Sequence, residues 1–113
     1  IQTNIMGDDK QMKENLLKII NNYGLSSQLK KLSEEIFELQ EAIVIRERDY
    51  KSCDTTIKMD MENKKHIEEE FADCCVVLEQ FKAYYNLDND RIINIMKQKI
   101  NRQLDRIEKE KNK

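Results

Sequence analysis

The stretch LSSQLKKLSEEIFELQEAI, from Leu25 to Ile43, has the strongest helical periodicity in the chain. Its apolar residues advance by four, three, four, three and four positions, which is the spacing of one face of an α-helix. They are Leu25, Leu29, Leu32, Ile36, Leu39 and Ile43. Carboxylates border this stripe instead of lying opposite to it. The sequence therefore predicts a long helix that carries acidic side chains at the edge of its buried face.

Composition extends this prediction to the whole chain. The 113 residues are 39% hydrophobic and 37% charged, with two glycines and no proline. Such a chain forms one domain of long helices with charged outer faces. It buries only a modest core when alone, and long helices leave apolar surface uncovered. We therefore expect an all-α helical bundle of about four helices, completed by formation of a homodimer or homotetramer.

Helical periodicity and capping residues divide the chain into four segments. These are predicted from Asp9 to a left-handed C-cap at Gly24, from a cap at Ser26 or Ser27 to about Lys51, from Met61 to Tyr85, and from a cap at Asp88 to Ile107. Residues 1–8 carry no pattern and are expected to fray, so that residues 9–113 form the single domain. Residues 52–60 break the period and predict a loop of about ten residues, long enough to be mobile or functional.

A second acidic cluster lies far from the first in sequence. Residues three apart project from the same side of a helix, so Glu35 projects with Glu38, and Glu70 with Asp73. If the two helices pack together, four carboxylates converge. Such a cluster repels itself unless protons or a hard cation neutralise it. The pattern predicts a Mg²⁺ site built from two helices.

These motifs resemble the signature of the MazG-like, all-α nucleoside triphosphate pyrophosphohydrolases. The matching residues are Glu34-Glu35-x-x-Glu38, the segment Glu69-Glu70-Phe71-Ala72-Asp73, the lead-in from Tyr23 through Gln28 to Lys31, and the basic pair Lys99-x-x-Arg102. The resemblance covers roughly Tyr23 to Ile107. One departure is the linker from Arg46 to His66, which is longer than in compact members of that family and is either an added turn or a lid.

The resemblance implies Mg²⁺-dependent cleavage of a ribo- or deoxynucleoside triphosphate between its α- and β-phosphates, with Mn²⁺ as a possible substitute. The products are a monophosphate and pyrophosphate. By motif position the metal ligands are Glu35, Glu38, Glu70 and Asp73, with Glu34 as a supporting or water-orienting carboxylate, and the substrate-binding residues are Gln28, Lys31, Lys99 and Arg102. The same plan resembles phosphoribosyl-ATP pyrophosphohydrolase, which is the alternative substrate assignment.

Other classes of function fit the sequence less well. A non-catalytic helical oligomerisation module is the main rival, because the apolar spacing between Leu25 and Ile43 is heptad-like. The net charge is −2, and although residues 91–113 carry a net charge of +5, acids are interspersed among them, so nucleic acid is not an expected partner. His66 has no companion for a zinc site, and the chain lacks a P-loop. Three cysteines without an apolar span or signal-like segment favour a cytoplasmic protein with no membrane partner.

Overall fold

A computed structural model describes residues 9–52 and 55–112. Within them lie four α-helices and no strand, which confirms the all-α prediction. The helices are α1 (Asp9–Tyr23), α2 (Leu25–Lys51), α3 (Ile57–Tyr84) and α4 (Asn89–Lys111). The segment 1–8, predicted to fray, and Cys53 in the predicted loop lie outside the described residues. None of the described helices is long and apolar enough to cross a membrane.

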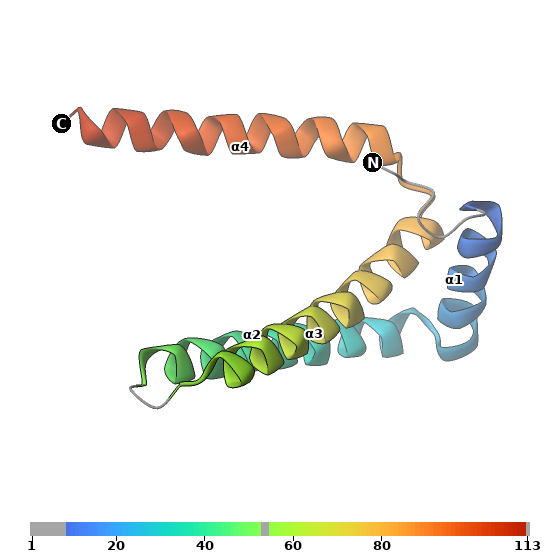
Figure 1. Cartoon of the computed structure of the whole chain (residues 1–113). Coiled ribbons are helices and arrows are strands. Elements are labelled where there is room, and N and C mark those ends of the chain that lie inside the picture. The colour runs from blue at the N-terminus through green and yellow to red at the C-terminus, as the bar shows by residue number, and fades with distance from the viewer. Residues whose placement is uncertain (1–8, 53–54, 113) are drawn as a thin grey trace.

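Three of the helices form a packed body, and the fourth leaves it. α2 and α3 run antiparallel as a hairpin, α1 crosses the end of that hairpin, and α4 extends away on its own (Figure 1). α4 packs against none of the other described helices. The radius of gyration is 18.1 Å, whereas a compact chain of this length has about 13 Å. A single copy of the chain is therefore an open shape.

Gly24 joins α1 to α2 without a loop. Its N–H donates to the carbonyl of Ile20 at 2.8 Å, and its own carbonyl accepts from the N–H of Gln28 at 3.1 Å. Its φ of 93° lies in the region that favours glycine. The predicted role of Gly24 in ending the first helix is confirmed. The predicted serine cap is wrong, because α2 already begins at Leu25 and its N-cap position is Gly24 itself.

The connection between α2 and α3 is shorter than predicted. α2 runs to Lys51, and α3 begins at Ile57 instead of Met61. Thr56 supplies the reason, because its Oγ1 accepts a hydrogen bond from the N–H of Met59 at 3.1 Å and caps the helix earlier. The predicted cap at Asp88 is confirmed by its bond from the Arg91 N–H at 3.1 Å. α4 continues past Ile107 to Lys111, because Glu and Lys favour helix.

The core does not lie along the apolar stripe that the sequence emphasises. Leu29, Ile36 and Ile43 of that stripe are 43–52% exposed, and on α3 the apolar residues Phe71 and Leu78, two turns apart, are 58% and 51% exposed. The buried residues of α2 are instead Gln28, Glu35 and Ala42, spaced by two turns, and the apolar core consists of Leu16, Ile20, Ala42, Cys74 and Val77. Because α2 packs mainly against a single helix, α3, the contact covers only part of the apolar surface of α2. The α2–α3 seam therefore includes three buried polar residues, Gln28, Glu35 and Gln80, beside its apolar ones.

Candidate metal centre

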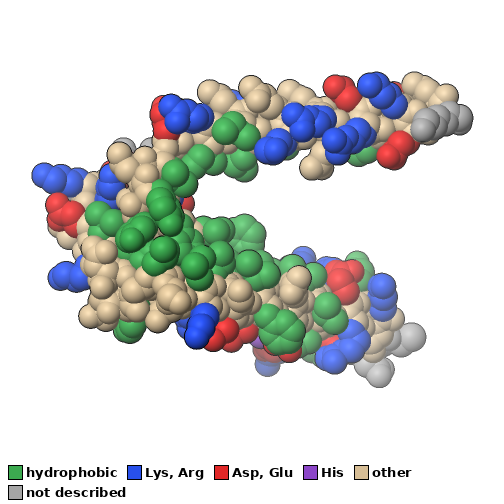
Figure 2. Space-filling model, turned by 180° about the vertical axis from the view of Figure 1, so that it is seen from behind, with side chains coloured by type: hydrophobic (Ala, Val, Ile, Leu, Met, Phe, Trp, Pro, Cys, Tyr) green, Lys and Arg blue, Asp and Glu red, His purple; other side chains and the backbone are tan. Residues whose placement is uncertain are grey.

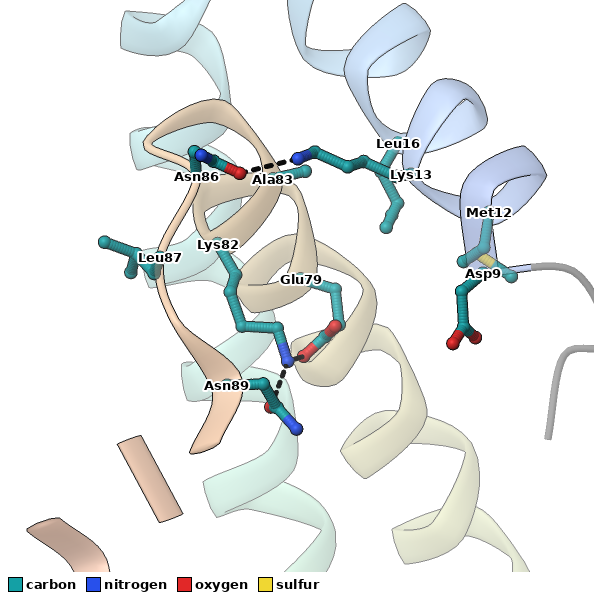
Figure 3. A pocket seen from close by; sticks show the side chains of 10 residues that line it. All are labelled: Asp9, Met12, Lys13, Leu16, Glu79, Lys82, Ala83, Asn86, Leu87 and Asn89. Carbon is teal, nitrogen blue, oxygen red and sulfur yellow. Dashed lines mark hydrogen bonds and ion pairs between the residues drawn. The ribbon is translucent and has the colours of Figure 1, made fainter. Parts of the chain in front are cut away.

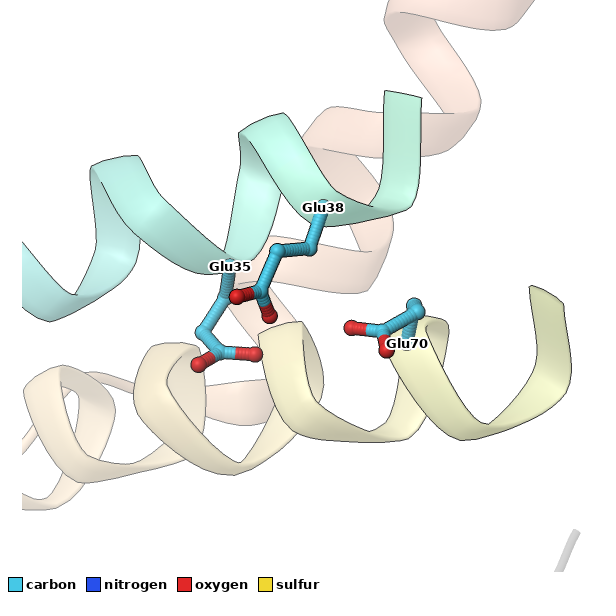
Figure 4. Close-up of side chains that lie close together, drawn as sticks. All are labelled: Glu35, Glu38 and Glu70. Atoms are coloured by element: carbon cyan, nitrogen blue, oxygen red, sulfur yellow. The ribbon is translucent and has the colours of Figure 1, made fainter. Parts of the chain in front are cut away.

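Three glutamates meet where α2 packs against α3. Glu35 and Glu38 project from α2 and Glu70 from α3, with their carboxylates turned toward one another (Figure 4). One oxygen from each lies within 4.8 Å of the others. The spacing of three residues on α2 places two of them on one side of the helix, and the antiparallel pairing brings the third across the seam.

Two of these carboxylates, those of Glu35 and Glu70, each have one buried oxygen without a hydrogen-bond partner among the described residues. Glu35 is only 4% exposed; its Oε1 lies 3.1 Å from Nζ of Lys31, whereas no described residue hydrogen-bonds to its Oε2. Glu70 is similar, with Oε1 3.4 Å from Nε2 of His66 and a buried Oε2 without a partner among the described residues. A buried carboxylate oxygen without a partner is costly to a protein. Two such oxygens in one cluster indicate a ligand-binding site.

The charges of the cluster also act on one another. The negative charge of Glu35, followed by partial burial and by Glu70, raises the pKa of Glu38 above its ordinary value of 4.5. Asp73 is exposed as a whole residue, but loss of water around its carboxyl, followed by the charges of Glu35 and Glu70, raises its pKa above 3.8. Both carboxyl groups thus favour a bound proton more than an isolated group does. A bound cation would relieve the same repulsion.

The donor set suits Mg²⁺. The cluster offers only carboxylate oxygens, which are the ligands of hard cations, and contains no thiolate or imidazole within the group of three. Ligands on one octahedral Mg²⁺ shell are about 2.9 to 4.2 Å apart, so oxygens that lie within 4.8 Å of one another reach such a shell by small side-chain rotations. Because Glu38 is exposed, the centre is open to solvent on one side and leaves room for water or a substrate phosphate.

A pocket of about 660 Å³ adjoins the carboxylates. Its wall includes Ile19, Tyr23, Gln28, Lys31, Asp73 and Gln80, contributed by α1, α2 and α3. Nε2 of Gln28 donates to Oε1 of Gln80 at 2.8 Å, and both side chains are buried. The pocket therefore combines an apolar wall, a fixed pair of amides and a carboxylate edge, as small-molecule sites do.

The structure brings some of the predicted site residues together and separates others. Three of the four predicted metal ligands, Glu35, Glu38 and Glu70, form the cluster, and Asp73 is not part of that group. Glu34 and Asp73 are exposed. Together with Lys31 and the buried Gln28, they line the adjoining pocket. The predicted substrate-binding residues Lys99 and Arg102 both lie on α4, which contacts α3 only through its first residue and packs against neither α2 nor α3. A single chain therefore does not bring those two cations to the carboxylates.

Two partners in the site were not predicted from the sequence. Gln80 forms the buried amide pair with Gln28, and His66 pairs with Glu70 one turn away. The spacing of four between His66 and Glu70 is visible in the sequence and could have indicated that contact. Gln80 gives no such signal, because its partner lies 52 residues away.

We compared the chain with family models, with curated proteins and with solved structures, and none of the three searches found a match.

Proposed function

We propose that this chain is a Mg²⁺-dependent nucleotide pyrophosphohydrolase that converts ribo- or deoxynucleoside triphosphates to monophosphate and pyrophosphate. The observation that carries the proposal is the convergence of Glu35, Glu38 and Glu70, with two buried oxygens that find no partner in the described part of the chain. Motif order supports it, because the residues that converge in space are those that resemble the MazG-like signature.

The chain's own residues divide between holding the cation and holding the nucleotide. Glu35, Glu38 and Glu70 would bind Mg²⁺, and Asp73, one turn beyond Glu70, completes the acidic edge. Bound Mg²⁺ would neutralise phosphate charge and lower the pKa of a coordinated water. Glu34 is exposed at the pocket wall, where a carboxylate can orient a water toward the α-phosphate.

The adjoining pocket gives the remainder of the nucleotide a place. Lys31 lies at the boundary between pocket and carboxylates, and its hydrogen bond to Glu35 raises its pKa, so it carries a positive charge at neutral pH. That ammonium can pair with a phosphate oxygen. Beyond it, Tyr23 and the amides of Gln28 and Gln80 present an aromatic ring and hydrogen-bonding groups to a sugar or base.

The test is pyrophosphate release from a panel of ribo- and deoxynucleoside triphosphates and phosphoribosyl-ATP, with Mg²⁺ and with EDTA. Glu70→Gln removes one ligand charge with little change in size. Glu68→Gln is the matched control, because Glu68 is exposed and its position lies about 200° around α3 from Glu70. We expect Glu70→Gln to lose more than about 100-fold in rate, beyond the 10- to 100-fold typical of groups that only support a ligand.

A second measurement keeps the metal site testable if none of these nucleotides is the substrate. Mg²⁺ should raise the melting temperature of the native chain and of Glu68→Gln but not that of Glu70→Gln. Full activity in a folded Glu70→Gln protein would disprove the assignment of the site. No release from any nucleotide, together with no Mg²⁺ stabilisation, would favour the non-catalytic helical module.

A further inference from the structure

Two glutamine side chains form a buried hydrogen bond in the wall of the pocket beside the carboxylates. Nε2 of Gln28 donates to Oε1 of Gln80 at 2.8 Å, and the two residues are only 7% and 2% exposed. Neither side-chain amide makes another hydrogen bond with a described residue, yet Oε1 of Gln28 and Nε2 of Gln80 are not sealed from solvent. Because both residues line the pocket, this acceptor and this donor open into it.

The stability of the fold does not explain why amides occupy these two positions. They lie in the α2–α3 seam among apolar core residues such as Val77, which is one turn from Gln80 on α3. Replacing both partners of a buried hydrogen bond by apolar groups of similar shape is often nearly neutral for stability. A pair of methionines would therefore fill the same space without polar groups. The amides indicate that this part of the wall forms hydrogen bonds with a ligand.

The amide pair lies at a fixed distance from the carboxylates along both helices. Gln28 precedes Glu35 by seven residues on α2, and in the antiparallel α3 Gln80 follows Asp73 by seven. Seven residues are two turns, or about 10 Å at 1.5 Å per residue. A nucleotide whose α-phosphate lies at the carboxylates spans such a distance with its sugar and base. Tyr23, which is 64% exposed, adds an aromatic ring to the same pocket wall.

A second pocket, of about 310 Å³, differs in that its lysines are already bonded to neighbouring side chains (Figure 3). Lys13 donates to Asn86 at 2.6 Å. Lys82 donates to Asn89 at 2.9 Å and pairs with Glu79 at 3.0 Å. Hydrophobic side chains also gather along the inside of the bend in Figure 2, but an apolar surface alone does not select a ligand. The glutamine pair is thus the better candidate for recognition.

We propose that Gln28 and Gln80 recognise the hydrogen-bonding edge of a nucleobase, so that the pocket selects nucleotides against sugar phosphates that lack a base. This inference rests on the proposed function, which places a nucleotide phosphate at the carboxylates. Each common base carries a donor and an acceptor side by side at one edge, and the amide pair presents one of each. A site built to hydrogen-bond its ligand rejects analogues that leave its polar groups unpaired.

The experiment measures binding instead of hydrolysis. Calorimetry in Mg²⁺ compares the 5′-monophosphates of adenosine, guanosine, cytidine and uridine with ribose 5-phosphate, which lacks a base. The native chain should bind the nucleotides at least about 10-fold more tightly, since leaving such groups unpaired costs about that factor or more. The double variant Gln28→Met/Gln80→Met should fold, lose this preference and bind ribose 5-phosphate as the native chain does. Gln40→Met is the control, because Gln40 is exposed about 120° around α2 from Gln28.

Gln80→Glu tests whether the pair reads the base or only supports the pocket. The new carboxylate still accepts the N–H of Gln28, but it presents an oxygen to the pocket where Gln80 presents a donor. Guanine alone among the four bases carries two adjacent donors, on N1 and N2. The variant should therefore shift relative affinity toward guanosine monophosphate by about 10-fold or more. A merely structural role would leave the ranking of the bases unchanged.

The outcomes separate this inference from the proposed activity. Equal affinity of the native chain for nucleotides and ribose 5-phosphate, or binding of neither, would overturn the inference even if the chain released pyrophosphate from nucleoside triphosphates. An unchanged ranking of the bases in Gln80→Glu would overturn it as well. Base-dependent binding that the double methionine variant loses would support it, and would do so even if no triphosphate were hydrolysed.

Discussion

The packed body formed by α1, α2 and α3 differs from α4 in burial, although both have clear apolar periodicity. Ile20 of α1 is 1% exposed, whereas Ile100 of α4 is 54% exposed. In the body, three helices cover one another, and the seam even encloses a glutamate. α4 has an apolar stripe, but none of the other described helices packs against it. Periodicity therefore identifies an apolar face of a helix, but it does not specify whether or by which surface that face is covered, since the apolar stripe of α2 is itself half exposed.

The same substitution, Ile to Ala, should change the free energy of unfolding far more in the packed body than in α4. Ile20→Ala should lower the free energy of unfolding by about 3 kcal/mol, since it leaves a cavity in the core. Ile100→Ala, measured at a dilution where the chain is monomeric, should change that free energy by less than about 0.5 kcal/mol. Urea unfolding followed by circular dichroism measures both.

The same two variants also test whether α4 packs on its own chain. Equal losses at high dilution would mean that α4 packs on its own chain. Unequal losses that become similar as concentration rises would instead show that α4 is buried between copies, because only an intermolecular contact depends on concentration.

The next effect concerns the acidic face of the body. In the absence of metal, the pKa values of Glu38 and Asp73 are raised, so the folded chain binds their protons more tightly than the unfolded chain does. Stability should therefore fall as the pH rises from about 4.5 through these raised pKa values. Melting temperatures in EDTA from pH 4 to 8 should show this fall, and Glu38→Gln should reduce it.

Mg²⁺ should reverse this destabilisation at neutral pH. Free Mg²⁺ at 100 times its dissociation constant adds about 2.7 kcal/mol to the stability of a native state that alone binds it. In EDTA at pH 7, Glu38→Gln should melt above the native chain, because it removes one of the repelling charges. An identical pH profile for the two proteins would show that the carboxylates do not repel one another in the folded state.

The sequence predicted the grouping of the carboxylates better than it predicted the core. Glu35, Glu38 and Glu70 could be grouped because spacing on a helix fixes which residues share a side. The burial of Glu35 could not be predicted, because it depends on where α3 crosses α2, and the apolar stripe through Leu29 and Ile36 suggested a different seam. Helix ends were predicted where a cap is distinctive, as at Asp88, and misplaced where several residues could serve, as at Thr56.

Two helix caps of similar geometry should differ slightly in what they contribute to the stability of the packed body. Thr56 accepts a hydrogen bond from the backbone of Met59 at the start of α3, and Asp88 accepts one from Arg91 at the start of α4, both at 3.1 Å. Thr56→Ala should lower the free energy of unfolding by about 1 kcal/mol, whereas Thr56→Ser, which keeps the hydroxyl, should not.

Asp88→Ala removes an equivalent bond from a helix that the body does not support. At high dilution we expect no change in the unfolding of the body, but faster amide hydrogen exchange in the first turn of α4. Loss of body stability in Asp88→Ala equal to that in Thr56→Ala would show that α4 and the body unfold as one unit within a single chain, contrary to the separation between them.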